Sequence, residues 1–234
     1  MKLWEIFEKG KFELRKWSSN RPELLTKFAD FQLAEPLLFH PDSQVKLSAL
    51  GIKWDPISDT FSFKSSEIDS TCTKRSILSN VAKIYDPLGW ISPIVFIVKC
   101  LIQQLWLLGL DWDSPVPNEV RNQWSTWASQ INRFHRLKCH VTHFALKWKK
   151  NQVIGFCDAS EKGYGACVYV QVTGKDSEIK THLLISKAKI APLKTLSIPR
   201  LELCGAVVLA KLLSYVKRFY TSCNIPVLKI FGPK

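Results

Sequence analysis

The chain has 234 residues, of which 46% are hydrophobic and 23% charged, and it contains 9 Trp and 13 Phe. This composition supplies a packed core and excludes disordered and fibrous proteins. Thirty-three Lys and Arg against 20 Asp and Glu leave a formal net charge of +13, which favours a polyanionic partner such as nucleic acid.

The number and spacing of the cysteines, together with the N-terminal residues, indicate the cellular compartment of the protein. Seven cysteines, an odd number with no Cys-x-x-Cys pair, do not form a disulfide framework, which indicates a reducing intracellular compartment, cytoplasmic or nuclear. The N-terminus mixes acidic and aromatic residues and therefore lacks the apolar core of a secretory signal. The most apolar stretch, residues 90–110, is interrupted by Pro93 and Lys99, so we expect a buried helix there and no membrane span.

The N-terminal residues predict short elements separated by turns. A short amphipathic helix breaks at Gly10, and residues 12–17 then alternate like a strand. The turn at 18–22 offers caps for a short helix that begins near Pro22.

A β-hairpin is predicted at residues 48–64. Apolar and polar residues alternate on both sides of residues 55–60, a segment rich in turn-forming Asp, Pro and Ser. Two alternating runs separated by such a turn are typical of a hairpin.

The centre of the chain predicts three helices. Apolar residues in 77–85 recur at helical spacing, and the sequence Asp-Pro-Leu-Gly at 86–89 ends that helix. A second helix begins with Ser92 as N-cap and Pro93 in its first turn, and runs to about Gly109. The third helix carries one apolar face, which we assign to core packing: Val120, Trp124, Trp127, Ile131 and Phe134.

From about residue 150 the pattern changes to strands followed by a long helix. Strands are expected at 153–158, 166–172 and 182–190, with a small-residue turn at 159–165, a helix from Pro199 to about Tyr220, and a last strand at 227–231. Three antiparallel strands, a helix and a further strand are an α/β layout.

One pair of carboxylates has a pattern that fits catalysis. Asp158 ends a buried strand before a Gly-rich turn, and Glu202 lies in the first turn of the following helix. Two such carboxylates hold divalent ions for in-line attack on a phosphodiester, in which one metal activates water and the other stabilises the leaving oxygen. An Asp and a Glu taken alone are most often solvated surface residues. The residues that flank them therefore decide whether a catalytic role is indicated.

Those flanking residues resemble the ribonuclease H fold of retroelement polyproteins. The resemblance rests on Gly155-Phe-Cys-Asp-Ala-Ser160, Lys162-Gly-Tyr-Gly-Ala166 and Ile198-Pro-Arg-Leu-Glu-Leu-Cys-Gly205. It implies that Asp158 is the first metal-binding Asp, that Glu202 is the helix Glu, and that the cofactor is Mg²⁺.

The upstream residues resemble the Pol polyprotein of BEL/Pao-type LTR retrotransposons. The motifs are Phe12-Glu-Leu-Arg-Lys-Trp-Ser-Ser-Asn20, Leu50-Gly-Ile-Lys-Trp-Asp55 and Ser79-Asn-Val-Ala-Lys-Ile-Tyr-Asp-Pro-Leu-Gly89.

The resemblance implies an α+β chain built from three parts. Residues 1–65 would be the end of a reverse-transcriptase palm, residues 70–150 its helical thumb and connection, and residues 151–234 a truncated RNase H-like α/β domain. The implied partners are nucleic acid, above all an RNA·DNA hybrid but also DNA or RNA, and the remaining Pol segments.

Two groups that the resemblance leads one to expect do not occur in the sequence. No Tyr-x-Asp-Asp motif of a polymerase is present, and the last predicted strand, in Val227-Leu-Lys-Ile-Phe-Gly-Pro-Lys234, is not followed by a third metal-binding Asp. We therefore expect both active sites to be incomplete, with weak Mg²⁺ binding at two carboxylates. A sheet that lacks strands also leaves an edge open to another chain.

Basic residues are candidates for contact with phosphates, because each such contact adds salt-dependent affinity. The candidates are Lys11, Arg15, Lys16, Arg133, Arg136, Lys138, Lys147, Lys149 and Lys150. The alternatives are an exposed strand face for the first three residues and a solvated basic linker for those in 133–150.

Two further patterns are weaker. His135, Cys139, His140 and His143 resemble metal-ligand spacing, but no second Cys/His pair is near in sequence to complete a structural zinc site. The region of these polyproteins is also catalogued as an aspartic peptidase. Neither Asp59-Thr60-Phe61 nor Asp113-Ser114-Pro115 has the Asp-Thr-Gly or Asp-Ser-Gly form that this chemistry requires.

The leading hypothesis is thus a Pol-derived segment that binds an RNA·DNA hybrid with little or no turnover. One alternative is a domesticated scaffold that binds protein through its thumb-like helices. Another is an RNase H nuclease completed by a partner chain or by residues beyond Lys234. High salt weakens hybrid binding strongly and protein binding hardly at all.

Overall fold

The computed structural model describes residues 3–28, 47–49, 52–63, 71–131, 138–140, 150–173, 178–222 and 229–231. The chain forms two compact units. The first comprises residues 1–64 and 134–142, and the second comprises residues 65–133 and 143–234. The helices predicted in the centre of the chain therefore share a compact unit with the strands that follow them.

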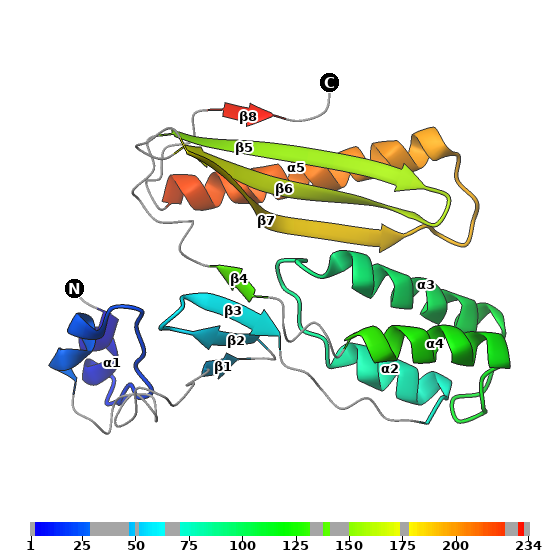
Figure 1. Cartoon of the computed structure of the whole chain (residues 1–234), viewed down its shortest axis with the longest axis horizontal. Helices are drawn as coiled ribbons and strands as arrows, with labels where there is room; N and C mark the ends of the chain where they lie inside the picture. Colours follow the sequence, from blue (N-terminus) through cyan, green and yellow to red (C-terminus); the bar gives the residue numbers. More distant parts are fainter. Residues whose placement is uncertain are drawn as a thin grey trace. The chain divides into compact units, whose positions relative to one another are not determined.

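In its described residues the first unit contains two short helices and a small sheet (Figure 1). Its elements are α1 (Leu3–Lys9), the 3-10 helix η1 (Pro22–Lys27), β1 (Leu47–Ala49), β2 (Ile52–Asp55), β3 (Thr60–Phe63) and β4 (Lys138–His140). The four strands are antiparallel in the order β1-β2-β3-β4. The helix before Gly10, the short helix at Pro22 and the hairpin are confirmed.

A buried carboxylate fixes the hairpin turn between β2 and β3. Asp59 has a φ of 48° and is only 6% exposed. Its Oδ1 accepts the indole N–H of Trp54 at 3.0 Å, and its Oδ2 accepts the side-chain amide of Asn20 at 3.1 Å. These bonds offset the cost of burying the charge.

The strand predicted at residues 12–17 is wrong. The structure has only an isolated bridge residue there, at Trp17. Lys11 and Lys16 have φ values of 59° and 61°, which interrupt an extended ladder. The Trp17 ring instead stacks on Phe28, with 4.6 Å between the ring centroids.

The second unit is built around a sheet covered on one face by a long helix (Figure 1). Its elements are β5 (Lys150–Ser160), β6 (Gly163–Thr173), β7 (Ile179–Ile190), α5 (Ile198–Ser222) and β8 (Lys229–Phe231). The strand order is β7-β6-β5-β8, in which β5, β6 and β7 are antiparallel neighbours and β8 is parallel to β5. The predicted succession of strands, helix and strand is confirmed.

The turn between β5 and β6 is shorter than the predicted 159–165. Gly163 and Gly165 lie in β6 and pair with Ser160 and Asp158. Their lack of a side chain serves close packing: a Cβ on Gly163 would lie 2.7 Å from the Phe96 ring. Glycine in a strand often marks such a close approach.

Alternation along the strands places one apolar face against α5. Val168, Val170 and Val172 of β6 are at most 1% exposed and pack in one cluster with Leu209 and Leu212 of α5. Full burial of each such side chain contributes about 1.5–3 kcal/mol, so this face is the main core of the sheet.

Three helices form a second core in the same unit. They are α2 (Lys74–Ala82), α3 (Ser92–Leu107) and α4 (Asn118–Ile131). The predicted apolar face of α4 is confirmed for Val120, Trp124 and Trp127, which are at most 6% exposed and pack with α2 and α3, whereas Phe134 lies outside the described residues.

Ser92 is not the N-cap of α3, contrary to prediction. The N-cap is Ile91, and no side chain of the cap residue bonds to the helix. The Asp86 carboxylate instead accepts the backbone N–H groups of Trp90 and Ile91, each at 2.9 Å. The carboxylate therefore binds N–H groups just before the helix, and not those in the first turn that an N-cap side chain would bind.

That same turn docks on β7. The Ser186 backbone N–H donates to the Leu88 carbonyl at 2.8 Å, the Ser186 hydroxyl donates to the Gly89 carbonyl, and the Trp90 indole donates to the Leu184 carbonyl at 3.3 Å. The helical segment therefore satisfies backbone groups on the outer side of β7.

Candidate nucleic-acid interface at one end of the sheet

The two predicted catalytic carboxylates come to the same end of the sheet. Because β6 is antiparallel to both neighbours, β5 and β7 run in the same direction, and Ser160 and Ile190 both pair with Gly163. Helix α5 follows β7 after residues 191–197, so it begins where β5 ends. Asp158 near the end of β5 and Glu202 near the start of α5 therefore share this end.

Helix α5 lies against the end of β5 at Gly205. A Cβ on Gly205 would lie 3.4 Å from the Asp158 carbonyl oxygen and 3.6 Å from the Cys157 Cβ. Glu202 precedes Gly205 by one helical turn, so it lies on the side of this contact toward the helix start. We call Asp158 and Glu202 the carboxylate pair.

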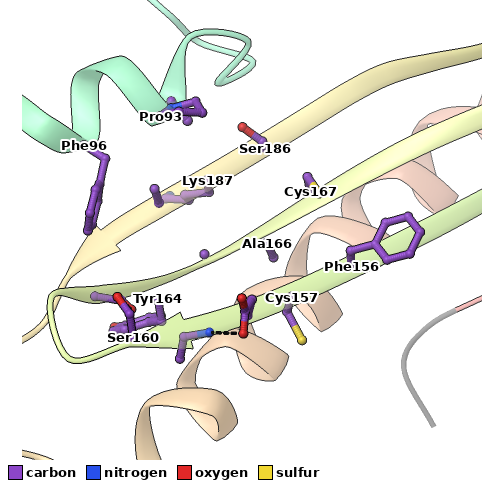
Figure 2. Close-up of a pocket in the computed structure, with 16 residues that line it drawn as sticks. Pro93, Phe96, Phe156, Cys157, Ser160, Tyr164, Ala166, Cys167, Ser186 and Lys187 are labelled. Atoms are coloured by element: carbon purple, nitrogen blue, oxygen red, sulfur yellow. Dashed lines mark hydrogen bonds between the residues drawn. The ribbon is translucent and has the colours of Figure 1, made fainter. Parts of the chain in front are cut away.

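Both carboxylates of the pair are exposed to solvent. The Asp158 Oδ1 accepts the backbone N–H of Ala159 at 2.8 Å, which is the dashed line in Figure 2 and fixes the side chain at the strand end. Exposed carboxylate oxygens suit Mg²⁺, which keeps several waters and uses one or two carboxylates together with substrate phosphates. The described residues contain no group of three or more His, Cys, Asp or Glu that could hold a metal ion.

Asp158 lines a pocket of about 380 Å³ that we call the sheet pocket. Figure 2 shows Pro93 and Phe96 of α3 on one side of it, and Phe156 and Lys187 on the strands. By strand alternation Phe156 and Asp158 lie on the face opposite Cys157. The pocket offers aromatic and aliphatic surface and one lysine next to the strand end that carries Asp158.

Burial also affects a thiol in this lining. Desolvation raises the pKa of the Cys167 thiol, against a smaller opposing effect of its hydrogen bond with the Phe156 backbone. A raised pKa keeps the thiol protonated near neutral pH and makes it a poor nucleophile or metal ligand.

The first three basic candidates lie in the first unit, whereas the carboxylate pair lies in the second. Lys11 and Lys16 are exposed. Arg15 is also exposed, but it forms a 2.7 Å ion pair with Glu13, which reduces the charge it presents to a phosphate.

Most of the basic stretch 133–150 is not in the described part of the chain. Arg133, Arg136, Lys147 and Lys149, with His135 and His143 of the weak metal pattern, lie outside the described residues. Lys138 belongs to β4 and Lys150 begins β5. Cys139 and His140 pair with Phe61 and Thr60 across β4 and β3.

Sequence reasoning missed the contribution of α3 to this end of the sheet. The sequence indicates Phe96 only as part of a buried helix, yet its ring lies against Gly163 and lines the sheet pocket. A small residue at position 163 was the one available signal, since it marks a close approach without naming the partner.

The sheet has the strand order β7-β6-β5-β8, with β8 parallel to β5 and α5 between β7 and β8 in the chain. A family model described as the Pao retrotransposon-like RNaseH-like domain matches residues 73–232. The match covers more than half of the 234 residues, so the chain belongs to this family. The matched region includes the three helices as well as the sheet. No curated protein matches the chain.

The length and polarity of each helix decide whether it could cross a membrane. Within the described ranges, every helix is too short or too polar to cross a bilayer.

Proposed function

We propose that this chain binds an RNA·DNA hybrid at the end of the sheet that carries Asp158 and Glu202, with little or no hydrolysis by the chain alone. The observation that carries the proposal is the convergence of an exposed Asp at the end of β5 and an exposed Glu at the start of α5 in an RNaseH-like domain of a Pao retrotransposon. The formal net charge of +13 favours a polyanionic ligand.

In this proposal Asp158 and Glu202 hold Mg²⁺. The ion would supply positive charge to a phosphate of the nucleic acid and would lower the pKa of a coordinated water. Asp158 is held in place by the Ala159 N–H, and the helical turn that carries Glu202 lies next to the contact of Gly205 with β5. With two protein carboxylates, the remaining ligands would be waters and phosphate oxygens, which makes the affinity low without nucleic acid.

The wider origin of the chain is part of the same proposal. The motifs in residues 12–20, 50–55 and 79–89 favour descent from a BEL/Pao-type Pol polyprotein, with residues 1–65 from a reverse-transcriptase palm and residues 70–150 from its thumb and connection. Other Pol segments are then natural partners, and the basic residues named above would extend the hybrid-binding surface.

The test measures binding and cleavage in the same samples. A fluorescent RNA·DNA hybrid is titrated with the full chain with and without Mg²⁺, binding is followed by anisotropy, and cleavage is followed on gels. We expect affinity to fall roughly tenfold or more between 50 and 200 mM salt. Mg²⁺ should tighten binding by wild type but not by Asp158→Asn or Glu202→Gln.

The same two kinds of substitution, made at residues outside the carboxylate pair, serve as controls. Asp111→Asn and Glu178→Gln alter exposed residues that lie away from the carboxylate pair in sequence and should keep the Mg²⁺ effect. Salt-insensitive binding, or a Mg²⁺ effect that persists in both site variants, would contradict the proposal. Mg²⁺-dependent cleavage lost in both site variants would show that the chain is a working nuclease.

A further inference from the structure

A second cavity lies beside the carboxylate pair and is built from helices and loops that the sequence did not connect. It has a volume of about 790 Å³ and is walled by α3, α4, the turn 161–162, residues 191–197 and the start of α5. All of these elements belong to the second unit. We call it the glutamine cavity, after Gln103, Gln104 and Gln123 in its lining. Its volume falls within the usual range for ligand sites.

The walls of the glutamine cavity are held together by one residue. The Ala191 backbone N–H donates to the Lys162 carbonyl at 2.9 Å, and the Ala191 carbonyl accepts the Gln103 side-chain amide at 2.8 Å. The strand turn, the loop and α3 are thereby joined, so the cavity exists before any ligand binds.

The chemistry of the lining suits a nucleobase. Glutamine amides carry a donor and an acceptor side by side, the arrangement that pairs with base edges. Phe96 and Leu193 supply apolar surface on which a flat ring can stack, and the Leu193 side chain is 63% exposed. Gln104 and Gln123 are exposed as well.

A lysine lies at the same cavity, next to the acidic residue Glu161, which also lines it. Lys162 and Cys100 both line it. Burial raises the pKa of the Cys100 thiol, and the charge of Lys162 opposes that rise, which is the effect of an ammonium group near the cavity wall. Such a group can bind the phosphate attached to a base in the cavity.

Residues that line the glutamine cavity are close in sequence to Asp158 and Glu202. Glu161 and Lys162 follow β5 directly, and Leu201, which also lines the cavity, precedes Glu202. The cavity and the carboxylate pair therefore adjoin at two places, the end of β5 and the first turn of α5.

We infer that the glutamine cavity binds an unpaired nucleobase of a nucleic-acid strand bound at the carboxylate pair. The preferred ligand is then a hybrid with a single-stranded extension, and a fully paired hybrid is the weaker one. This inference rests on the proposed hybrid binding, and it adds that the chain prefers a hybrid with unpaired nucleotides.

The test compares three hybrids with the full chain by anisotropy: a blunt hybrid, the same hybrid with a short single-stranded extension, and one whose extension has abasic sites. One stacked base contributes enough for the extension to tighten binding by about tenfold. The abasic extension should give no such gain, because it has the phosphates without the bases. A fluorescent adenine analogue in the extension should change its emission on binding.

Two variants and one matched control locate the effect. Gln123→Leu and Gln104→Leu should lose most of the gain from the extension and bind the blunt hybrid as wild type does. Asn122→Leu removes the side-chain amide of the neighbouring exposed residue of α4, which does not line the cavity, and should keep the gain. Circular dichroism melts verify that all three variants fold.

The outcomes separate this inference from the proposed function. Equal affinity for blunt and extended hybrids, an equal gain from the abasic extension, or an equal loss in Asn122→Leu and Gln123→Leu would overturn the inference and leave hybrid binding intact. Failure to bind any of the three hybrids would overturn both.

Discussion

At the scale of single residues, glycines decide which elements come into contact. Gly155 lets Leu209 of α5 pack on β5, Gly163 admits the Phe96 ring, and Gly89 lies against the Ser186 carbonyl. Sequence reasoning could propose Asp158 and Glu202 as metal ligands because their places, at a strand end and in a first helical turn, are local features. It could not identify what each glycine contacts, since that partner is remote in sequence.

Gly89 gives a sharp test of this role. Its φ is +71°, and a Cβ there would overlap the Ser186 carbonyl oxygen. We expect Gly89→Ala to reduce the free energy of unfolding by about 3 kcal/mol or more, because it adds a backbone collision to the cost of a left-handed conformation. Urea denaturation measures the change.

Gly109→Ala is the matched control. Gly109 has a φ of +62° and nothing within 4 Å of a built Cβ, so only the conformational cost of about 1 kcal/mol remains. Equal losses in the two variants would mean that the contact of Gly89 with β7 contributes nothing to stability.

At the scale of elements, hydrophobic period and turn chemistry located most helices and strands. The hairpin β2–β3, the helices α2 to α5 and the strands β5 to β7 all follow patterns visible in the sequence. The failure at residues 12–17 has a local cause in the positive φ values of Lys11 and Lys16. The N-cap prediction at Ser92 failed because Ser92 is itself the first residue of α3, and the N-cap is Ile91.

The start of α3 can be tested with two substitutions. Asp86→Ala removes an acceptor of two backbone N–H bonds and should cost about 1–2 kcal/mol of unfolding free energy. Ser92→Ala should change it by less than about 0.5 kcal/mol, since Ser92 is not the N-cap. Denaturation curves in which Ser92→Ala costs as much as Asp86→Ala would contradict this account.

The pH dependence of the Asp86 effect has a defined sign. Burial raises the pKa of the Asp86 carboxyl above its usual value, against the opposing effect of its backbone hydrogen bonds. When the pKa of a carboxyl group is higher in the folded state than in the unfolded state, protonation stabilises the fold. This contribution to stability is complete below the pKa of the unfolded state, and it is lost as pH rises through the pKa of the folded state. The stability difference between wild type and Asp86→Ala should therefore be larger in mild acid than at neutral pH, as measured by urea denaturation at both pH values.

At the scale of the whole molecule, the helices and the RNaseH-like sheet form one compact unit, and the family match begins at residue 73, within this helical segment. Besides the bonds at Leu88 and Trp90, Gln103 of α3 donates to Ala191 beyond the end of β7. These contacts cover backbone groups of β7 that would otherwise be open to another chain.

Truncation tests this unit directly. A piece spanning residues 71–234 should unfold in one cooperative transition, whereas residues 150–234 alone should melt at a lower denaturant concentration or self-associate, because β7 loses the Asp86–Ile91 turn. Urea melts followed by circular dichroism, with light scattering for association, measure both. An unchanged midpoint and a monomeric state for residues 150–234 would show that the sheet does not depend on the helices.

The sequence by itself determined the succession of strands and helices and the resemblance to a retroelement RNase H-like domain, and it led to the proposal of Asp158 and Glu202 as metal ligands. These depend on spacing between residues near one another in the chain, and local spacing sets period, caps and turns. Only the tertiary structure decided that α3 and the 86–91 turn pack on β7, and that Gln103, Gln104, Gln123 and Lys162 line one cavity. Such contacts join residues far apart in sequence through close packing, which no local pattern specifies.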